Sequence, residues 1–193
     1  MTSGVEASRP VRILTVCSHN RTRSVMAAAL LDSKLTERLG AGAVLIRSSG
    51  FGPVDLPAID DAVAAMRRRG LDVSAHRSSA TTASLVDGAD LILTAERDHV
   101  VKIAALSSAA FRRALTLPEF LAANAYGADD DGGDIRAWVE SMTAERTAGE
   151  YLRADVPEVD DPTGSAPRAF EAAVVAIEQQ CDDVVALLAQ HLT

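Results

Sequence analysis

Residues 11–24 read VRILTVCSHNRTRS, an apolar run that ends at Cys17 and passes directly into a polar stretch. The run at residues 11–16 has the length and the β-branched content of a buried strand. Apolar residues then recur at helical spacing over residues 25–39, and Gly40 follows as a helix stop. A strand, a polar turn and a helix in this order are typical of the first unit of an α/β fold, so we expect strands and helices to alternate after it.

The alternation continues to the C-terminus. Further apolar runs and periodic segments predict strands at residues 43–46, 89–94 and 114–117, and helices at residues 58–69, 96–106, 135–146 and 167–191. The last helix carries one apolar stripe, formed by Phe170, Val174, Ile177, Cys181, Val184 and Leu188. Strands joined by helices form parallel sheets with right-handed crossovers. The sequence therefore predicts an α/β fold with a small four-stranded parallel sheet flanked by helices, of the flavodoxin-like three-layer kind.

Length and composition indicate one globular domain. The chain has 193 residues, of which 48% are hydrophobic and only 4% aromatic, so small aliphatic side chains must supply most of the core. We expect residues 1–10 to form a flexible tail and residues 11–193 a single domain. Residues 119–160 interrupt the strand–helix rhythm and contain an acidic, Gly-rich stretch at residues 126–134. This part of the chain is predicted to be an extended insertion.

Charge and cysteine content limit the binding partners and the cellular compartment that we expect. A formal charge of -8 disfavours general binding to nucleic acid or to an anionic membrane, because both would repel the protein. Residues 1–10 lack the apolar core of a signal peptide. Two cysteines far apart in sequence suit neither a disulfide framework nor a CxxC zinc site. We expect a cytoplasmic protein.

The polar stretch at residues 17–24 has the composition of an anion-binding loop. A loop between a strand and a helix offers backbone N–H groups and a helix N-terminus to an anion, and the same positive field favours the thiolate form of Cys17. Arg23 can bind two phosphate oxygens with its planar guanidinium, and the Ser24 hydroxyl can donate to the sulfur. The alternative for Cys17 is an inert core thiol, which would not require a polar loop with two arginines. We predict a phosphate-binding loop after the first strand.

Asp161 is the candidate general acid. It lies in a polar segment, residues 147–164, that is predicted to be a loop, and Pro162 restricts the backbone beside it. An Asp-Pro pair is also an ordinary turn signal, so this reading stays open on position alone. The neighbouring Asp160 is a second candidate for the same role.

The combination of Cys17-x5-Arg23-Ser24 with a distant Asp161-Pro162 resembles the low-molecular-weight protein tyrosine phosphatases, whose loop usually reads Cys-x-Gly-Asn-x-Cys-Arg-Ser. Three further stretches are similar to family motifs: Ser-Ser-Gly at residues 48–50, Arg-Gly-Leu-Asp-Val-Ser-Ala-His-Arg at residues 69–77, and Ala-Asp-Leu-Ile-Leu-Thr-Ala-Glu-Arg at residues 89–97. The resemblance covers residues 11–118 and 155–190.

The resemblance implies hydrolysis of phosphate monoesters, with phosphotyrosine on proteins as the expected substrate and inorganic phosphate as product. Cys17 would form a phosphocysteine intermediate, Arg23 would stabilise the phosphoryl oxygens, and Asp161 would protonate the leaving group. The resemblance implies that no metal or other cofactor is needed. The substrate-binding loop would comprise Ser18, His19, Asn20, Arg21, Thr22 and Ser24. Asn20 and Ser24 would also belong to a supporting hydrogen-bond network with Ser48 and His76.

Several residues depart from the family pattern. His19 stands where the family has Gly, which matters if that position needs a positive φ. Thr22 replaces a second loop cysteine, so we expect peroxide to carry Cys17 to irreversible acids more readily than in the relatives. Thr163-Gly164 follows Asp161-Pro162 where many relatives have tyrosines, which leaves Phe51 as the candidate aromatic wall; the alternative for Phe51 is a loop side chain packed on the core.

Two other functions remain possible from the sequence. Some proteins with this loop reduce arsenate, but they commonly relay electrons through additional cysteines. Here the second cysteine, Cys181, lies on an apolar helix stripe, so an external thiol would have to serve. The other alternative is a catalytically weak relative that binds phosphate or phosphotyrosine.

Overall fold

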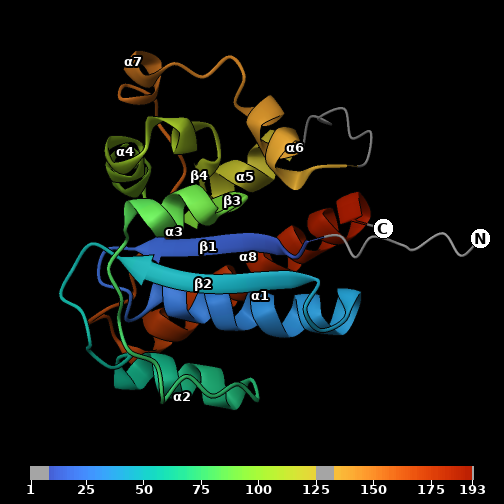
Figure 1. Ribbon diagram of the computed structural model, residues 1–193. Coiled ribbons are helices and arrows are strands. Elements are labelled where there is room, and N and C mark those ends of the chain that lie inside the picture. The colour runs from blue at the N-terminus through green and yellow to red at the C-terminus, as the bar shows by residue number, and fades with distance from the viewer. Residues whose placement is uncertain (1–8, 125–132, 193) are drawn as a thin grey trace, which may run out of the picture.

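A four-stranded sheet forms the centre of the computed structural model, which describes residues 9–124 and 133–192 (Figure 1). The strand order is β2-β1-β3-β4 and each neighbouring pair is parallel, with β1 at Val11–Cys17, β2 at Val44–Gly50, β3 at Leu91–Thr94 and β4 at Ala114–Thr116. The predicted sheet is confirmed. Most of the predicted tail, residues 1–8, and residues 126–132 of the acidic stretch lie outside the described residues.

Helices cover both faces of the sheet (Figure 1). α1 and α8 pack together on one face, and α3 and α4 lie on the other. The helices are α1 (Arg23–Leu39), α2 (Asp60–Arg68), α3 (Ala83–Gly88), α4 (Arg97–Leu106), α5 (Leu117–Asn124), α6 (Ile135–Met142), α7 (Ala148–Tyr151) and α8 (Pro167–Leu192), with a 3-10 helix, η1, at Ser108–Arg112. Among the described residues no helix has the length and apolar character needed to cross a membrane.

The alternation of side chains along β1 divides the interior into two cores. Ile13 and Cys17 belong to the core beneath α1 and α8, whereas Leu14 and Val16 belong to the core beneath α3 and α4. Each fully buried aliphatic side chain of this size contributes about 1.5–3 kcal/mol through removal from water. This burial holds β1 in place, and Cys17 at its end faces the core beneath α1 and α8.

The second strand is longer than the sequence predicted. The predicted strand ended at residue 46, but β2 continues to Gly50, which pairs with Cys17. Ser and Gly are weak strand formers, and tertiary contacts hold them extended here: the buried Ser49 hydroxyl lies 2.8 Å from Thr81 Oγ1. The end of β2 is thereby fixed beside the polar loop that follows β1.

Short helices were missed at several points. α3 and η1 were not predicted, α5 follows β4 directly, and α7 forms within the segment predicted to be a loop, residues 147–164. The described part of residues 119–160 contributes to both cores: Phe120 and Trp138 meet edge to face at 5.9 Å, and Tyr151 is buried beneath the other face. The description of residues 119–160 as an insertion in a single domain stays a prediction.

Candidate active site

Cys17 lies at the carboxyl end of β1 with a hydroxyl group on its sulfur. Its side chain is buried, and Sγ is 3.0 Å from Ser24 Oγ in the first turn of α1. Asn20 Nδ2 lies 3.0 Å from the same oxygen. Because the Asn20 amide nitrogen can only donate, the Ser24 oxygen accepts from it and keeps its own hydrogen for the sulfur. A hydrogen bond of this kind stabilises a thiolate.

Asn20 holds the loop in its curved shape. It has a φ of 52°, a left-handed conformation that Asn adopts more readily than most residues. His76 Nε2 donates to the Asn20 carbonyl at 2.8 Å, and the Ser79 backbone N–H donates to Asn20 Oδ1 at 2.9 Å. The positive φ that was considered for His19 thus falls on the next residue, and His19 is not strained in this way.

Hydrogen bonds link the four residues that were selected for a supporting network. Asn20 contacts Ser24 and His76 directly, whereas Ser48 takes part through its carbonyl oxygen, which accepts from Ser79 Oγ at 3.0 Å. Ser79, which the sequence reasoning did not select, therefore links β2 to Asn20.

The end of β2 also presses directly on the loop. A Cβ at Gly50 would lie 2.7 Å from the Asn20 backbone nitrogen and 2.9 Å from the Cys17 carbonyl oxygen. Both are backbone atoms, which cannot rotate away. Next along the chain, the Phe51 backbone N–H donates to the Ser18 carbonyl at 2.9 Å. Glycine is required at position 50 because the two backbones touch there.

Arg23 is buried behind the loop and gathers acceptors from distant segments. Nη1 donates to the Val159 carbonyl at 3.0 Å, and Nη2 contacts Ser18 Oγ at 3.3 Å. Two carboxylates lie on the same nitrogen: Asp161 Oδ2 at 3.0 Å and Glu96 Oε1 at 2.5 Å. The guanidinium thus joins the loop after β1, the loop after β3 and the segment before α8.

Asp161 reaches Arg23 from 138 residues further along the chain. Its other oxygen accepts from the Thr163 backbone N–H at 3.0 Å, and Thr163 Oγ1 lies 3.2 Å from Thr22 Oγ1 in the loop. The Asp161 side chain is 45% exposed, so solvent and substrate can reach it. Asp160 is also exposed, and it is Asp161 that contacts the loop arginine.

The remaining predicted residues surround the same loop. Arg21 turns outward, where its Nε donates to the Pro57 carbonyl at 2.7 Å. Phe51 is half-buried against the second core and stacks on the His99 ring with centroids 5.9 Å apart. It therefore borders the loop and packs on the core at once, so the structure combines the two alternatives considered for it.

Sequence reasoning missed Glu96 and His99. His99 is buried at the start of α4, and its Nε2 lies 3.1 Å from Ser18 Oγ. Burial lowers the pKa of His99 to about 4, with Arg23 acting in the same direction and Glu96 opposing it. The available signal was their position soon after a predicted strand, residues 89–94, because the carboxyl ends of parallel strands meet at one edge of the sheet.

The second cysteine lies within the core. Cys181 is fully buried on α8, and its sulfur faces the Ala27 carbonyl of α1 at 4.0 Å. Burial raises the pKa of this thiol well above its ordinary value. These features fit the core role that the helix stripe predicted.

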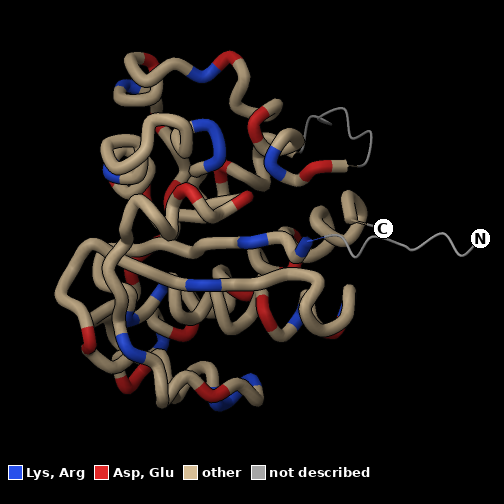
Figure 2. The backbone as a smooth tube through the Cα atoms, viewed as in Figure 1, with Lys and Arg blue, Asp and Glu red and all other residues tan. Residues whose placement is uncertain are grey.

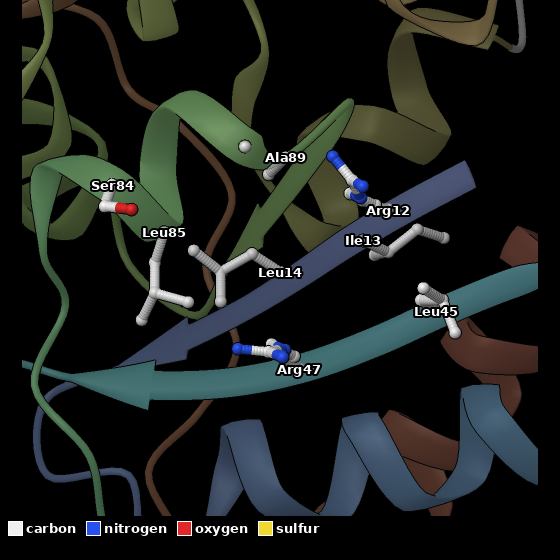
Figure 3. Close-up of a pocket in the computed structure, with 9 residues that line it drawn as sticks. Arg12, Ile13, Leu14, Leu45, Arg47, Ser84, Leu85 and Ala89 are labelled. Carbon is white, nitrogen blue, oxygen red and sulfur yellow. The ribbon is translucent and has the colours of Figure 1, made fainter. Parts of the chain in front are cut away.

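A separate groove of about 300 Å³ lies at the other end of β1. Figure 3 shows Leu14, Leu85 and Ala89 along it, with Arg12 and Arg47 projecting from neighbouring strands. The predicted site residues do not line this groove.

Figure 2 shows acidic and basic residues interspersed along the backbone, with no continuous basic stripe over the part of the chain that is drawn in colour. Within the described ranges, no three or more His, Cys, Asp or Glu side chains gather in a way that would hold a metal ion.

Comparison with known proteins identifies relatives with the same fold. Residues 12–130 match the family of low molecular weight phosphotyrosine protein phosphatases. The chain is 44% identical over 82 residues to the probable low molecular weight protein-tyrosine-phosphatase EpsP of Ralstonia solanacearum, which covers 42% of this chain and 52% of that protein. The chain thus spans about half the length of this relative.

Arginine phosphatases are also similar. A protein-arginine-phosphatase of Geobacillus stearothermophilus is 32% identical over 126 residues, covering 65% of this chain and 78% of that protein. The structure of the YwlE arginine phosphatase from the same organism superposes with a TM-score of 0.69 at 25% identity, covering 94% of each chain. The match over residues 12–130, which is more than half of the sequence, shows that the chain belongs to the low molecular weight phosphotyrosine protein phosphatase family.

Proposed function

We propose that this protein hydrolyses phosphate monoesters, with protein phosphotyrosine as the first candidate substrate, through a phosphocysteine intermediate. One observation carries the proposal: a thiol with a hydroxyl donor 3.0 Å from its sulfur, and a buried guanidinium that contacts a carboxylate, converge on one loop. Such a loop supplies a nucleophile, an oxyanion clamp and a proton donor together.

In the first step the Cys17 sulfur attacks phosphorus, and an S–P bond forms as the bond from phosphorus to the leaving oxygen breaks. Asp161 gives its proton to that oxygen, so the leaving group departs neutral. Backbone N–H groups of the loop and Arg23 stabilise the equatorial phosphoryl oxygens. Because both carboxylates lie on Arg23 Nη2, that nitrogen must exchange at least one of them for a phosphoryl oxygen.

In the second step the Asp161 carboxylate takes a proton from a water molecule as the water attacks phosphorus. The S–P bond breaks, the thiolate returns and inorganic phosphate leaves. The sequence of bond changes balances without a metal or a redox partner. Both cysteines are free, which is compatible with the reducing cytoplasm that we propose as the compartment. We propose neither nucleic acid nor a membrane as a partner.

Phosphoarginine is the second candidate substrate. The relatives named as arginine phosphatases support it, as do the two carboxylates, Glu96 and Asp161, that lie close together at Arg23. A guanidinium leaving group is cationic and would be attracted to carboxylates, whereas a phenol would not. Matched peptides that carry phosphotyrosine or phosphoarginine distinguish the two through their kcat/KM ratio.

The test of the proposal is hydrolysis of para-nitrophenyl phosphate by the reduced protein in the presence of a metal chelator. Wild type should be active, Cys17→Ser inactive, and Cys181→Ala, which also removes one thiol, active. The proposal would be overturned if the folded wild-type protein hydrolysed neither this ester nor any of the matched phosphopeptides. Arsenate reduction with an external thiol, and phosphopeptide binding without turnover, would then be measured to test the other two functions.

A further inference from the structure

His99 lies outside the loop, and its two ring nitrogens connect the start of α4 to Ser18 of the loop. The Glu96 backbone N–H is 3.1 Å from His99 Nδ1, and His99 Nε2 is 3.1 Å from Ser18 Oγ. A backbone N–H can only donate, so Nδ1 must be the acceptor. In a neutral imidazole the proton is then on Nε2. The ring therefore donates to Ser18, which directly follows Cys17.

The surroundings of His99 hold the ring neutral and in one orientation. It is 1% exposed, and the Phe51 ring lies parallel to it within 11°. Burial is the main cause that lowers the pKa of His99 to about 4; Arg23 from α1 and Lys102 from α4 add to it, whereas Glu96 and Asp98 oppose it. At neutral pH the ring is thus an uncharged donor with a fixed tautomer.

Ser18 Oγ also has a second donor nearby. Arg23 Nη2 lies 3.3 Å from it and, like every guanidinium nitrogen, can only donate. A hydroxyl oxygen has two lone pairs and one hydrogen. When His99 and Arg23 occupy both lone pairs, the Ser18 hydrogen has to point to a further acceptor. An anion that displaces a carboxylate from Arg23 would supply such an acceptor.

We propose that His99 is a positioning residue that makes the Ser18 hydroxyl a fixed hydrogen-bond donor to the phosphoryl group bound at Cys17. The inference rests on the proposed function for its phosphoryl substrate. It assigns to Ser18 a side-chain role in addition to that of its backbone, and it assigns to His99 a role that acts only through Ser18.

Two substitutions of His99 separate this role from a structural one. Asn can place an acceptor near the Nδ1 position and retain the contact with the Glu96 N–H, but it is too short to reach Ser18. Gln can place an N–H donor near the Nε2 position and retain the contact with Ser18. If His99 positions Ser18, the His99→Gln variant should keep more of the wild-type affinity for phosphate than the His99→Asn variant does. If His99 only caps α4, the order is reversed and the proposal is overturned.

The measurements are the dissociation constant of inorganic phosphate, by calorimetry on the full chain, and kcat/KM for para-nitrophenyl phosphate. Ser18→Ala and His99→Asn should each weaken phosphate binding and lower kcat/KM by roughly 10- to 100-fold, as for a hydrogen bond to a charged group. The double variant should be no worse than either single variant, because the two residues act as one unit. Multiplicative losses, or a Ser18→Ala variant that matches wild type, would overturn the proposal.

Nitrogen-15 NMR of the imidazole gives a readout that is independent of activity. Wild type should show His99 with a protonated Nε2 and an unprotonated Nδ1 at neutral pH, and the opposite tautomer would contradict the inference. A wild type that binds phosphate but hydrolyses no ester would refute the proposed function alone, since the binding and NMR measurements still decide the role of His99.

Discussion

Replacing Gly50 by Ala tests the packing of β2 on the phosphate loop. The added Cβ would lie 2.7 Å from Asn20 N, whereas ordinary contact begins at 3.4 Å, so the two backbones must separate by about 0.7 Å. Overpacking of this kind costs about 1–3 kcal/mol. For a protein of this size, 1 kcal/mol changes Tm by about 2–4 °C, so we expect Tm to fall by roughly 2–12 °C.

The same displacement should lower kcat/KM even under conditions in which the variant stays folded. Asn20 positions Ser24, and Ser24 donates to the Cys17 sulfur, so a shifted loop moves the nucleophile. A misplacement of reacting groups by about 1 Å can cost about 100-fold in rate. We expect kcat/KM for para-nitrophenyl phosphate to fall by roughly 10- to 100-fold at a temperature where the variant is fully folded.

Gly88 provides the matched control. It lies at the end of α3, and an added Cβ would meet nothing within 4 Å. Gly88→Ala should leave kcat/KM unchanged and raise stability slightly, because Ala is favoured over Gly in helices by up to about 1 kcal/mol. Thermal unfolding and steady-state kinetics on both variants complete the comparison. A Gly50→Ala protein with wild-type Tm and kcat/KM would show that β2 and the loop do not pack as described.

Three further predictions follow from the site and its surroundings. The free energy of unfolding should fall by up to about 3 kcal/mol as pH drops from about 6.5 to about 4. The reason is that His99 in the unfolded chain takes up a proton at its ordinary pKa, whereas folded His99, with a pKa of about 4, does not. Denaturant unfolding should show this dependence on pH, and His99→Asn should reduce it. Asp161→Asn should lower kcat by about 10²–10⁴-fold for phenyl phosphate and by less for para-nitrophenyl phosphate; equal losses would remove Asp161 from the role of general acid. Prolonged peroxide treatment should inactivate the protein irreversibly, because Cys181 is buried in the core and Thr22 replaces a loop cysteine; mass spectrometry should find Cys17 as sulfinic or sulfonic acid, and full recovery with dithiothreitol would contradict this.

The sequence predicted those parts of the site that are local in the chain or chemically distinctive. Cys17, Arg23 and Ser24 lie within eight residues, and their chemistry indicated a phosphate loop without knowledge of the fold. Asp161 was selected because Pro162 follows it and because the pair occurs in the family pattern. The strand–helix alternation predicted the parallel sheet, since hydrophobic periodicity survives in a single sequence.

Contacts that depend on the spatial order of the strands were not predicted. His99 lies 81 residues from Ser18 and meets it because β3 pairs with β1, an adjacency that periodicity does not specify. Ser79 was missed for a similar reason, since its segment joins the end of β2 through backbone hydrogen bonds. The polar residues Ser48 and Ser49 resembled a loop because their partners in β1 and at Thr81 are distant in sequence.

The two carboxylates on Arg23 have a consequence for turnover. Glu96 and Asp161 are tethered beside the guanidinium, so each acts as an intramolecular competitor whose effective concentration no dilution can lower. Inorganic phosphate has to displace such a competitor to stay bound, which raises its apparent dissociation constant. When phosphate leaves, either carboxylate can again neutralise the buried guanidinium. In the proposed reaction, Arg23 could thus stabilise the transition state strongly and still release the phosphate product.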